Sequence, residues 1–225
     1  TAISMWLSAL IITVYVLNKK SLKQYLPPWT PVAPDPTAIK SILVLGFPVG
    51  ATMFLETAVF TGIALLVSSL GDVAIGAHQI AFNVWDMFYI PMLAIGGAMA
   101  TRMGHAIGAQ DKPGVYRALK AGIIYSVAVS ATTMVVLLSL PNLIVSVYTQ
   151  STDMSLLAVR LLSFAALFVM IDAVQIVGSF SMRAYKKTTF PFIASMVAYW
   201  LIALPLGYYL GIMNSDNASD GAAGF

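Results

Sequence analysis

Long apolar stretches, each of a length that can cross a lipid bilayer, dominate this sequence of 225 residues and limit the folds open to it. About 18 or more predominantly apolar residues in a row indicate a membrane-spanning helix. Six stretches can be drawn, the first of them short for a complete span, at residues 2–18, 41–70, 76–104, 117–140, 155–182 and 189–212. Only 9% of the residues are charged, whereas a typical soluble domain has about 25%. The sequence therefore predicts an all-α polytopic membrane protein with six transmembrane segments.

The loops between these stretches differ in charge. Lysine and arginine gather in the loops 19–40, 105–116 and 183–188 and at their flanks, whereas the charged residues of the other loops are Asp72, Asp153, Asp216 and Asp220. Loops rich in Lys and Arg stay in the cytoplasm, so we predict that the three basic loops are cytoplasmic. The basic residues follow this topology and form no stripe for nucleic acid, so we expect no nucleic-acid partner.

The first basic loop also separates two parts of the chain. Residues 19–40 contain five prolines, and a proline-rich segment acts as a semi-rigid spacer. We therefore predict that residues 1–18 end an earlier helical bundle, that residues 19–40 form a linker, and that residues 41–225 form a second bundle. The chain contains no cysteine, which excludes disulfides and thiolate metal sites within it.

Two carboxylates interrupt the apolar stretches. Glu56 lies near the middle of residues 41–70 and Asp172 near the middle of residues 156–182, and neither has a basic neighbour in the sequence. An ionised carboxylate at the bilayer centre costs at least about 2.5 kcal/mol on insertion scales, so such residues are rare and face a partner or a water-filled cavity. Glu56 and Asp172 are therefore the first candidates for binding a cation or a proton.

Further polar side chains recur at helical spacing. Gln79, Asn83 and Asp86 are four and three residues apart, so they share one face of a helix, and Tyr89 extends that face. A similar stripe begins at Asp172. Polar faces are costly against lipid, so we expect them to line a common interior. Carboxylate, phenol and amide oxygens suit a hard cation such as Na⁺, and a carboxylate can instead hold a proton.

Each assignment has a structural alternative. The two central carboxylates are open to a role as protonated carboxyls that bond backbone carbonyls of other helices. Asp86 is equally open to water exposure near the outer surface, and Tyr89 to ordinary packing. Gln79 and Asn83 are open to helix–helix hydrogen bonding. We expect His78 to lie at the membrane interface.

These residues stand within strings that resemble the multidrug and toxic compound extrusion (MATE) family. Its seventh helix resembles GFP at 46–48, FLE at 54–56 and ALLVSSLG at 64–71. Its eighth helix resembles AHQIAFN at 77–83 and RMGHAIGA at 102–109, and its tenth resembles DAVQIVGS at 172–179 and RAYK at 183–186. Order and spacing agree along nearly the whole chain, and the match is closest to the bacterial branch described as sodium-coupled.

The resemblance implies a transporter of twelve helices in two six-helix lobes in a bacterial inner (plasma) membrane. This chain then covers about helix six to helix eleven, with residues 41–225 as the carboxyl-terminal lobe without helix twelve and the amino-terminal lobe as its partner. The family's cation-site acids fall on Glu56 and Asp172, a helix-eight tyrosine falls on Tyr89, and a drug-cavity position falls on Gln79. Many relatives carry a tyrosine one turn before the helix-ten acid, where this chain has Phe168 and so lacks one hydroxyl ligand.

The function indicated is multidrug efflux by secondary antiport, in which lipophilic, cationic drugs leave in exchange for Na⁺ or H⁺ across the lipid membrane. No covalent chemistry, cofactor or nucleotide loop is indicated, so we expect no enzyme. The predicted cation-binding residues are Glu56, Asp172 and Tyr89, of which Glu56 and Asp172 are the predicted Na⁺ ligands. The predicted substrate contacts are Gln79, Asn83 and Asp86.

Other classes stay open beside this interpretation. One is a flippase of the same superfamily that moves lipid-linked substrates. A second is a passive membrane channel, which counterflow measurements distinguish from an antiporter. The third is an intramembrane aspartyl hydrolase, which requires two acids that share a proton and which release of a cleaved product would support.

Overall fold

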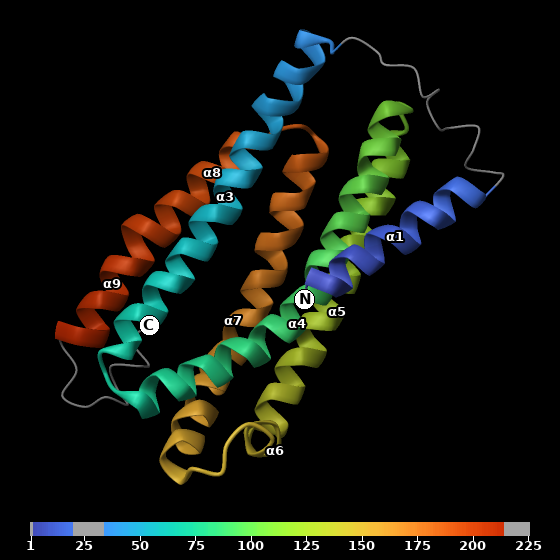
Figure 1. Ribbon diagram of the computed structural model, residues 1–225. Helices are drawn as coiled ribbons and strands as arrows, with labels where there is room; N and C mark the ends of the chain where they lie inside the picture. Colours follow the sequence, from blue (N-terminus) through green and yellow to red (C-terminus); the bar gives the residue numbers. More distant parts are fainter. Residues whose placement is uncertain (1, 20–33, 214–225) are drawn as a thin grey trace. The chain divides into compact units, whose positions relative to one another are not determined.

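The structure, a computed structural model, describes residues 2–19 and 34–213, and among these residues helices are formed and no strand is (Figure 1). Two π-helical segments flank α9: η1 (Val197–Ala203) and η2 (Tyr209–Met213). The α-helices are α1 (Ala2–Asn18), α3 (Pro36–Ser68), α4 (Asp72–Gly108), α5 (Lys112–Ser139), α6 (Pro141–Ser146), α7 (Thr152–Ala184), α8 (Thr189–Met196) and α9 (Leu204–Tyr208).

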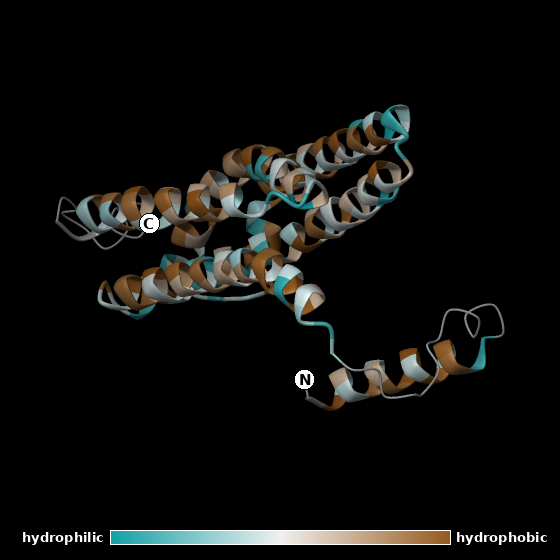
Figure 2. Ribbon diagram, turned by 90° about the horizontal axis from the view of Figure 1, so that it is seen from above, coloured by the Kyte–Doolittle hydropathy of each residue, from teal (hydrophilic) through white to brown (hydrophobic). Residues whose placement is uncertain are grey.

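The helices have the length and composition of membrane spans. Within the described ranges five are long and apolar enough to cross a bilayer, namely α3, α4, α5, α7 and the run Thr189–Gly211, and Ile3–Asn18 is a shorter apolar helix. Hydrophobic residues extend along the helices in Figure 2. Large apolar side chains such as Phe47 and Phe54 on α3 are exposed by more than two thirds, at 74% and 72%. The protein is therefore a polytopic, all-helical membrane protein, as the sequence predicts.

Several helices extend beyond the apolar stretches that predict them. Helix α3 begins at Pro36, inside the predicted linker 19–40, and α4 begins at Asp72 rather than at residue 76. A helix continues as long as its backbone hydrogen bonds do, so polar first turns lengthen it past the apolar run. The short helix α6, which begins at Pro141, was not predicted. The predicted linker residues 20–33, together with Asp216 and Asp220, lie outside the described residues.

Backbone contacts divide the chain into two units, Thr1–Lys40 and Ser41–Phe225. In the first unit α1 carries exposed apolar side chains, among them Ile3 and Trp6. The second unit starts at the residue where the sequence analysis begins its carboxyl-terminal lobe. That the two regions belong to separate lobes of a larger transporter stays a prediction.

The second unit has its closest backbone packing among α4, α5 and α7. Small side chains allow this approach, because buried alanines of both helices belong to one core cluster. They are Ala74, Ala77 and Ala81 on α4 and Ala158, Ala166 and Ala173 on α7. Gly96 on α4 marks a tight point, since a Cβ atom there would lie 2.7 Å from Cδ2 of Phe180. Small residues at such crossings are typical of membrane helices.

Helix α3 and the last span meet their neighbours mainly through side chains. A Cβ atom added at Gly62 of α3 would lie 4.0 Å from Cδ1 of Leu204, and Figure 1 shows α3 beside the α8–α9 span. The last span changes from α- to π-helix and back around Pro205. A proline has no N–H group and its ring collides with the carbonyl one turn earlier, so a local shift in hydrogen bonding is expected before it.

Candidate functional site

A cavity of about 680 Å³ lies within the second unit, between α3, α4, α7 and η1. We call it the acidic cavity, because three of its lining residues are carboxylates: Glu56, Asp86 and Asp172. Its other polar lining residues are Thr57, Thr61, His78, Gln79 and Gln175, and its aromatic lining residues are Phe60, Phe82, Trp85, Tyr89, Phe168 and Tyr199. The cavity combines apolar walls with a few polar groups, as small-molecule sites do.

The two mid-span acids face this cavity from different helices. Glu56 comes from α3 and Asp172 from α7, and both are half-buried. The indole Nε1 of Trp85 donates a hydrogen bond to Oδ2 of Asp172 at 3.1 Å. This bond joins α4 to α7 and holds one carboxylate oxygen of Asp172, leaving the other for a ligand.

Four aromatic rings line one side of the cavity. Trp85 stacks on Tyr89 with ring centroids 4.5 Å apart. Phe60 of α3 lies 5.2 Å from Phe82 and 5.7 Å from Trp85, and Phe82 lies 5.8 Å from Trp85. Such separations fall within the range of favourable aromatic pairs. The rings therefore connect α3 to α4 and form a continuous aromatic wall beside the carboxylates.

The π-helical segment η1 contributes Tyr199 to the cavity. Nε2 of Gln175 donates a long hydrogen bond of 3.4 Å to the Tyr199 hydroxyl. A π-helical turn carries an extra residue relative to an α-helix, and such turns occur frequently at functional sites. The irregular span thus places a phenol in the cavity lining, beside Gln175 of α7.

The structure brings five of the six predicted site residues to one cavity. Glu56, Tyr89, Asp172, Gln79 and Asp86 line it, whereas Asn83 does not. The roles assigned to all six stay predictions.

Asn83 lies off the cavity for a geometric reason. Each residue turns a helix by about 100°, so Asn83 lies about 40° from Gln79 on the flank away from Phe82 and Tyr89. Its amide Nδ2 donates to the backbone carbonyl of Gln79 at 2.7 Å, and its side chain is exposed. The sequence analysis placed these residues on one face, but the cavity covers only part of that face.

His78, which is expected at the membrane interface, also lines the acidic cavity. Its Nδ1 is buried and has no hydrogen-bond partner among the described residues. A buried imidazole nitrogen without a partner is costly. His78 therefore adds a polar group on the same wall as Gln79.

Sequence reasoning did not select Trp85, Phe60, Phe82 or Tyr199 as site residues. Trp85 lies six residues after Gln79 and one before Asp86, between residues of the polar stripe in the sequence, and that position was the available signal. The phenylalanines gave no signal, because aromatic residues are common in membrane helices. Tyr199 lies shortly before Pro205, and the interruption of the span was its signal.

The described residues contain no group of three or more His, Cys, Asp and Glu side chains placed to hold a metal ion.

Comparison with known proteins identifies the family of the chain. The family model described as MatE matches residues 48–209, which include α4, α5, α7 and most of α3. The chain belongs to the MatE family. The same residues carry the acidic cavity, so the site lies within the matched region.

Named relatives of this MatE chain are multidrug resistance proteins. A "Multidrug resistance protein NorM" from Photobacterium profundum is 36% identical over 94% of this chain and 46% of its own length. A NorM protein from Vibrio cholerae is 35% identical over 95% of this chain and 47% of its own length. A "Multidrug resistance protein MdtK" from Edwardsiella ictaluri is 31% identical over the whole chain and 49% of its own length. The MatE chain therefore spans about half the length of the curated relatives it matches.

Proposed function

We propose that this chain contributes the cation site and part of the drug cavity to a secondary antiporter that exports lipophilic, cationic compounds in exchange for Na⁺ or H⁺. The observation that carries the proposal is the meeting of Glu56 and Asp172 in one aromatic-walled cavity inside a membrane bundle. The names of the MatE relatives support multidrug export.

The coupling ion is proposed to bind between Glu56 and Asp172. The two carboxylates supply charge, and Tyr89 and Tyr199 supply neutral oxygens in the same lining. Oxygen ligands of this kind suit a hard cation. A proton on one carboxylate is the alternative with the same charge, and the choice between Na⁺ and H⁺ is left to the experiment.

The drug is proposed to lie against the aromatic wall of Phe60, Phe82 and Trp85. A cation over an aromatic face gains about 0.5–2 kcal/mol, more when the site is desolvated, and the ring surfaces accept an apolar body. Gln79 and Asp86 lie in the same lining and supply polar contacts. Asn83 is not part of this proposed site, because it does not line the cavity.

Coupling follows if ion and drug compete for the same negative charge. A ligand shifts a conformational equilibrium only through its different affinities for the two states. An ion that draws Glu56 and Asp172 together favours one arrangement of α3 and α7. A cationic drug that uses the same charges favours another, and exchange of one for the other drives transport.

The composition of the acidic cavity also separates this proposal from a flippase of lipid-linked substrates. Such substrates carry phosphate groups, which Arg and Lys bind. The described lining of the acidic cavity contains three acids and neither Arg nor Lys. The cavity therefore suits a cation better than an anionic lipid.

The test uses the full-length transporter in proteoliposomes, with efflux of a cationic dye driven by an imposed Na⁺ gradient at fixed pH. Glu56→Gln with Asp172→Asn removes both proposed ligands and is expected to abolish the sodium-driven component. Asp72→Asn with Asp153→Asn is the matched control, since it removes two exposed carboxylates from first helical turns outside the cavity. Efflux that follows a pH gradient and ignores sodium assigns the same acids to protons.

Two outcomes contradict the proposal. Efflux that is unchanged by the double substitution in the cavity shows that both carboxylates are structural. Dye movement that continues without any ion gradient and shows no counterflow identifies a passive channel instead.

A further inference from the structure

A second cavity, of about 1000 Å³, lies between the second half of α4 and the first half of α5. It shares no lining residue with the acidic cavity. We call it the α4–α5 cavity. Nothing in the proposed antiport uses it, and its chemistry is the reverse of the acidic cavity, because Arg102, His105 and Arg117 line it.

The polarity of this cavity changes along the helix axes. Its basic residues lie near the turn that joins α4 to α5. Its apolar lining, which includes Ile95 and Tyr125, lies deeper in the span. Arg102 and Ile95 are seven residues apart, which is about 10 Å along a helix. The cavity is therefore basic at the membrane surface and apolar toward the membrane interior.

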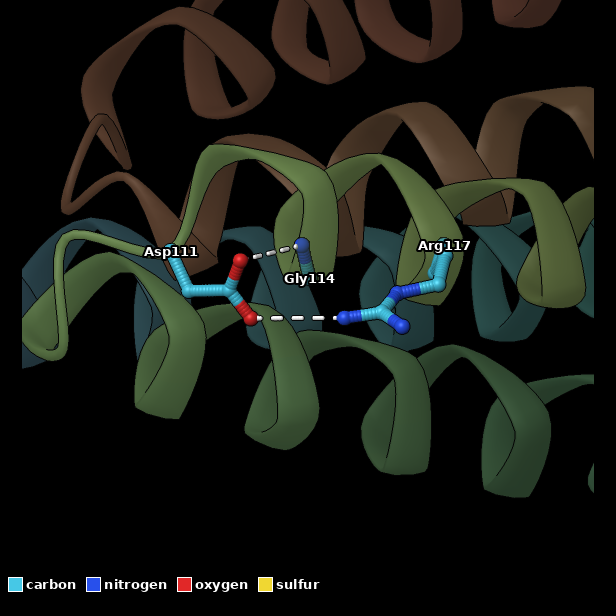
Figure 3. A network of polar contacts seen from close by, with 3 residues as sticks. All are labelled: Asp111, Gly114 and Arg117. Atoms are coloured by element: carbon cyan, nitrogen blue, oxygen red, sulfur yellow. Dashed lines mark hydrogen bonds and ion pairs between the residues drawn. The ribbon is translucent and has the colours of Figure 1, made fainter.

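The one acid in the described lining, Asp111, is already engaged (Figure 3). Its Oδ1 accepts from the backbone N–H of Gly114 at 2.9 Å and caps α5, and its Oδ2 lies 3.5 Å from Nη2 of Arg117. The Arg117 side chain is 76% exposed, so this ion pair is weak. A guanidinium has five N–H donors, and most of those of Arg117 remain for a ligand.

Arg102 forms no ion pair with any of the described residues. Arg102 lies on α4 and Arg117 on α5, so the cavity has an arginine on each of its two helices. Arginine is suited to phosphate because its planar fork binds two oxygens at once.

Close helix packing fixes the wall of this cavity. At Gly122 on α5, a Cβ atom would lie 2.2 Å from the sulfur of Met99 on α4. The two helices therefore meet at a glycine and a methionine that both line the cavity. At this level the Met99 side chain lies directly against the α5 backbone.

We propose that the α4–α5 cavity binds an anionic phospholipid, with the phosphate at Arg102 and Arg117 and an acyl chain along the apolar lining. Basic pockets between membrane helices on the cytoplasmic side bind anionic headgroups, and the charge of the loops predicts that this end is cytoplasmic. A free phosphate ion satisfies the basic end alone. The apolar half of the cavity is what favours a lipid over the ion.

The test measures lipid retention by native mass spectrometry on the delipidated full-length protein, titrated with phosphatidylglycerol or with phosphatidylcholine of the same chains. We expect preferential retention of phosphatidylglycerol. Arg102→Gln with Arg117→Gln is expected to weaken that binding about tenfold or more. Lys112→Gln with Lys120→Gln removes the same charge from α5 outside the cavity and is expected to weaken phosphatidylglycerol binding clearly less than the arginine pair does.

Two further arms distinguish the lipid from a phosphate ion and guard against misfolding. Ala98→Phe narrows the cavity at an exposed position without touching its charges and is expected to reduce lipid binding several-fold. Arg102→Lys with Arg117→Lys keeps the charge and is expected to retain much of the binding. Elution volume and thermal unfolding in detergent verify that each variant is folded.

Three results overturn the proposal. Equal losses of phosphatidylglycerol binding in the Arg→Gln pair and in the Lys→Gln pair show that diffuse surface charge, and not the cavity, holds the lipid. Full displacement of phosphatidylglycerol by equimolar inorganic phosphate, with no effect of Ala98→Phe, identifies a phosphate ion site. Equal retention of the two lipids shows that the cavity does not select an anionic headgroup.

Discussion

At the scale of single residues, the hydrogen bond from Trp85 to Asp172 is the most specific feature of the acidic cavity. It is donated across two helices at 3.1 Å, and Trp85 is also the centre of the aromatic wall, in contact with Phe60, Phe82 and Tyr89. The indole therefore links the proposed drug surface to the proposed cation ligand. A movement of the Trp85 ring therefore also displaces the donor that holds the Asp172 carboxylate.

We expect Trp85→Phe to weaken binding of the coupling ion while leaving the fold intact. The ring remains, but the donor to Asp172 is lost, and a hydrogen bond to a charged group contributes about 1.5–3 kcal/mol. Because the Asp172 carboxylate is then positioned less firmly, the ion concentration for half-maximal efflux by the full-length transporter should rise by about two- to tenfold. Trp200→Phe is the control, because Trp200 does not line the cavity. An unchanged ion dependence of Trp85→Phe would remove the positioning role of this residue.

Phe168→Tyr tests the ligand that the resemblance marks as missing. Phe168 lines the acidic cavity one turn before Asp172, so a hydroxyl at this position adds a neutral oxygen near the carboxylate. We expect tighter ion binding, by about two- to tenfold for a bond of 0.5–1.5 kcal/mol.

The matched control for this gain is Phe164→Tyr. Phe164 lies one turn further from Asp172 on the same helix and does not line the cavity. Ion affinity in both variants is read from the ion dependence of dye efflux. A gain in both, or in neither, counts against a cation site beside Asp172.

At this scale the sequence predicted the acids and Tyr89 but missed the other rings of the aromatic wall. Glu56 and Asp172 are conspicuous because a carboxylate within a span carries a large penalty. Phe60 and Phe82 carry none, so nothing in the sequence distinguishes them from lipid-facing residues. Asn83 was misplaced because shared spacing defines a helix face broader than the cavity that covers it.

At the scale of elements, hydropathy located the five long spans but not their ends. Helix α4 starts at Asp72 and α5 at Lys112, in polar first turns that no apolar window includes. The π-helical segments were also beyond reach. Pro205 marks a break, but the neighbouring helices decide how the freed backbone groups are satisfied.

Gly96→Ala and Gly97→Ala form a matched pair for the α4–α7 contact. A Cβ at position 96 would lie 2.7 Å from the Phe180 ring, whereas at position 97 its nearest neighbour is 3.9 Å away. Both changes replace Gly by Ala within a helix, so the gain in stability from helix propensity is the same and cancels in the comparison. We expect Gly96→Ala to be less stable than Gly97→Ala by about 1–3 kcal/mol, the cost of overpacking.

Thermal unfolding of the two glycine variants in one detergent measures this difference. The Gly97→Ala variant should match or exceed the parent protein in unfolding temperature. Equal unfolding temperatures for both variants would show that Phe180 moves aside without cost and that the crossing is not tight.

At the scale of the whole molecule, the acidic cavity is walled by α3, α4, α7 and η1 of one unit. The curated relatives are about twice as long as this chain. We therefore expect the chain by itself to give no ion-driven dye efflux above that of empty liposomes. Efflux from the chain alone that is lost in Glu56→Gln would contradict this expectation.

The position of Glu56 and Asp172 on differently packed helices has a consequence for regulation by the ion. Asp172 belongs to α7, which is held closely by α4 and α5, whereas Glu56 belongs to α3, which meets its neighbours mainly through side chains. An ion shared by both carboxylates is then a link between a fixed helix and one with more freedom. Under the proposed function, occupancy of the site by the ion would favour an arrangement with α3 close to α7, and the external ion concentration would then control the width of the proposed drug cavity.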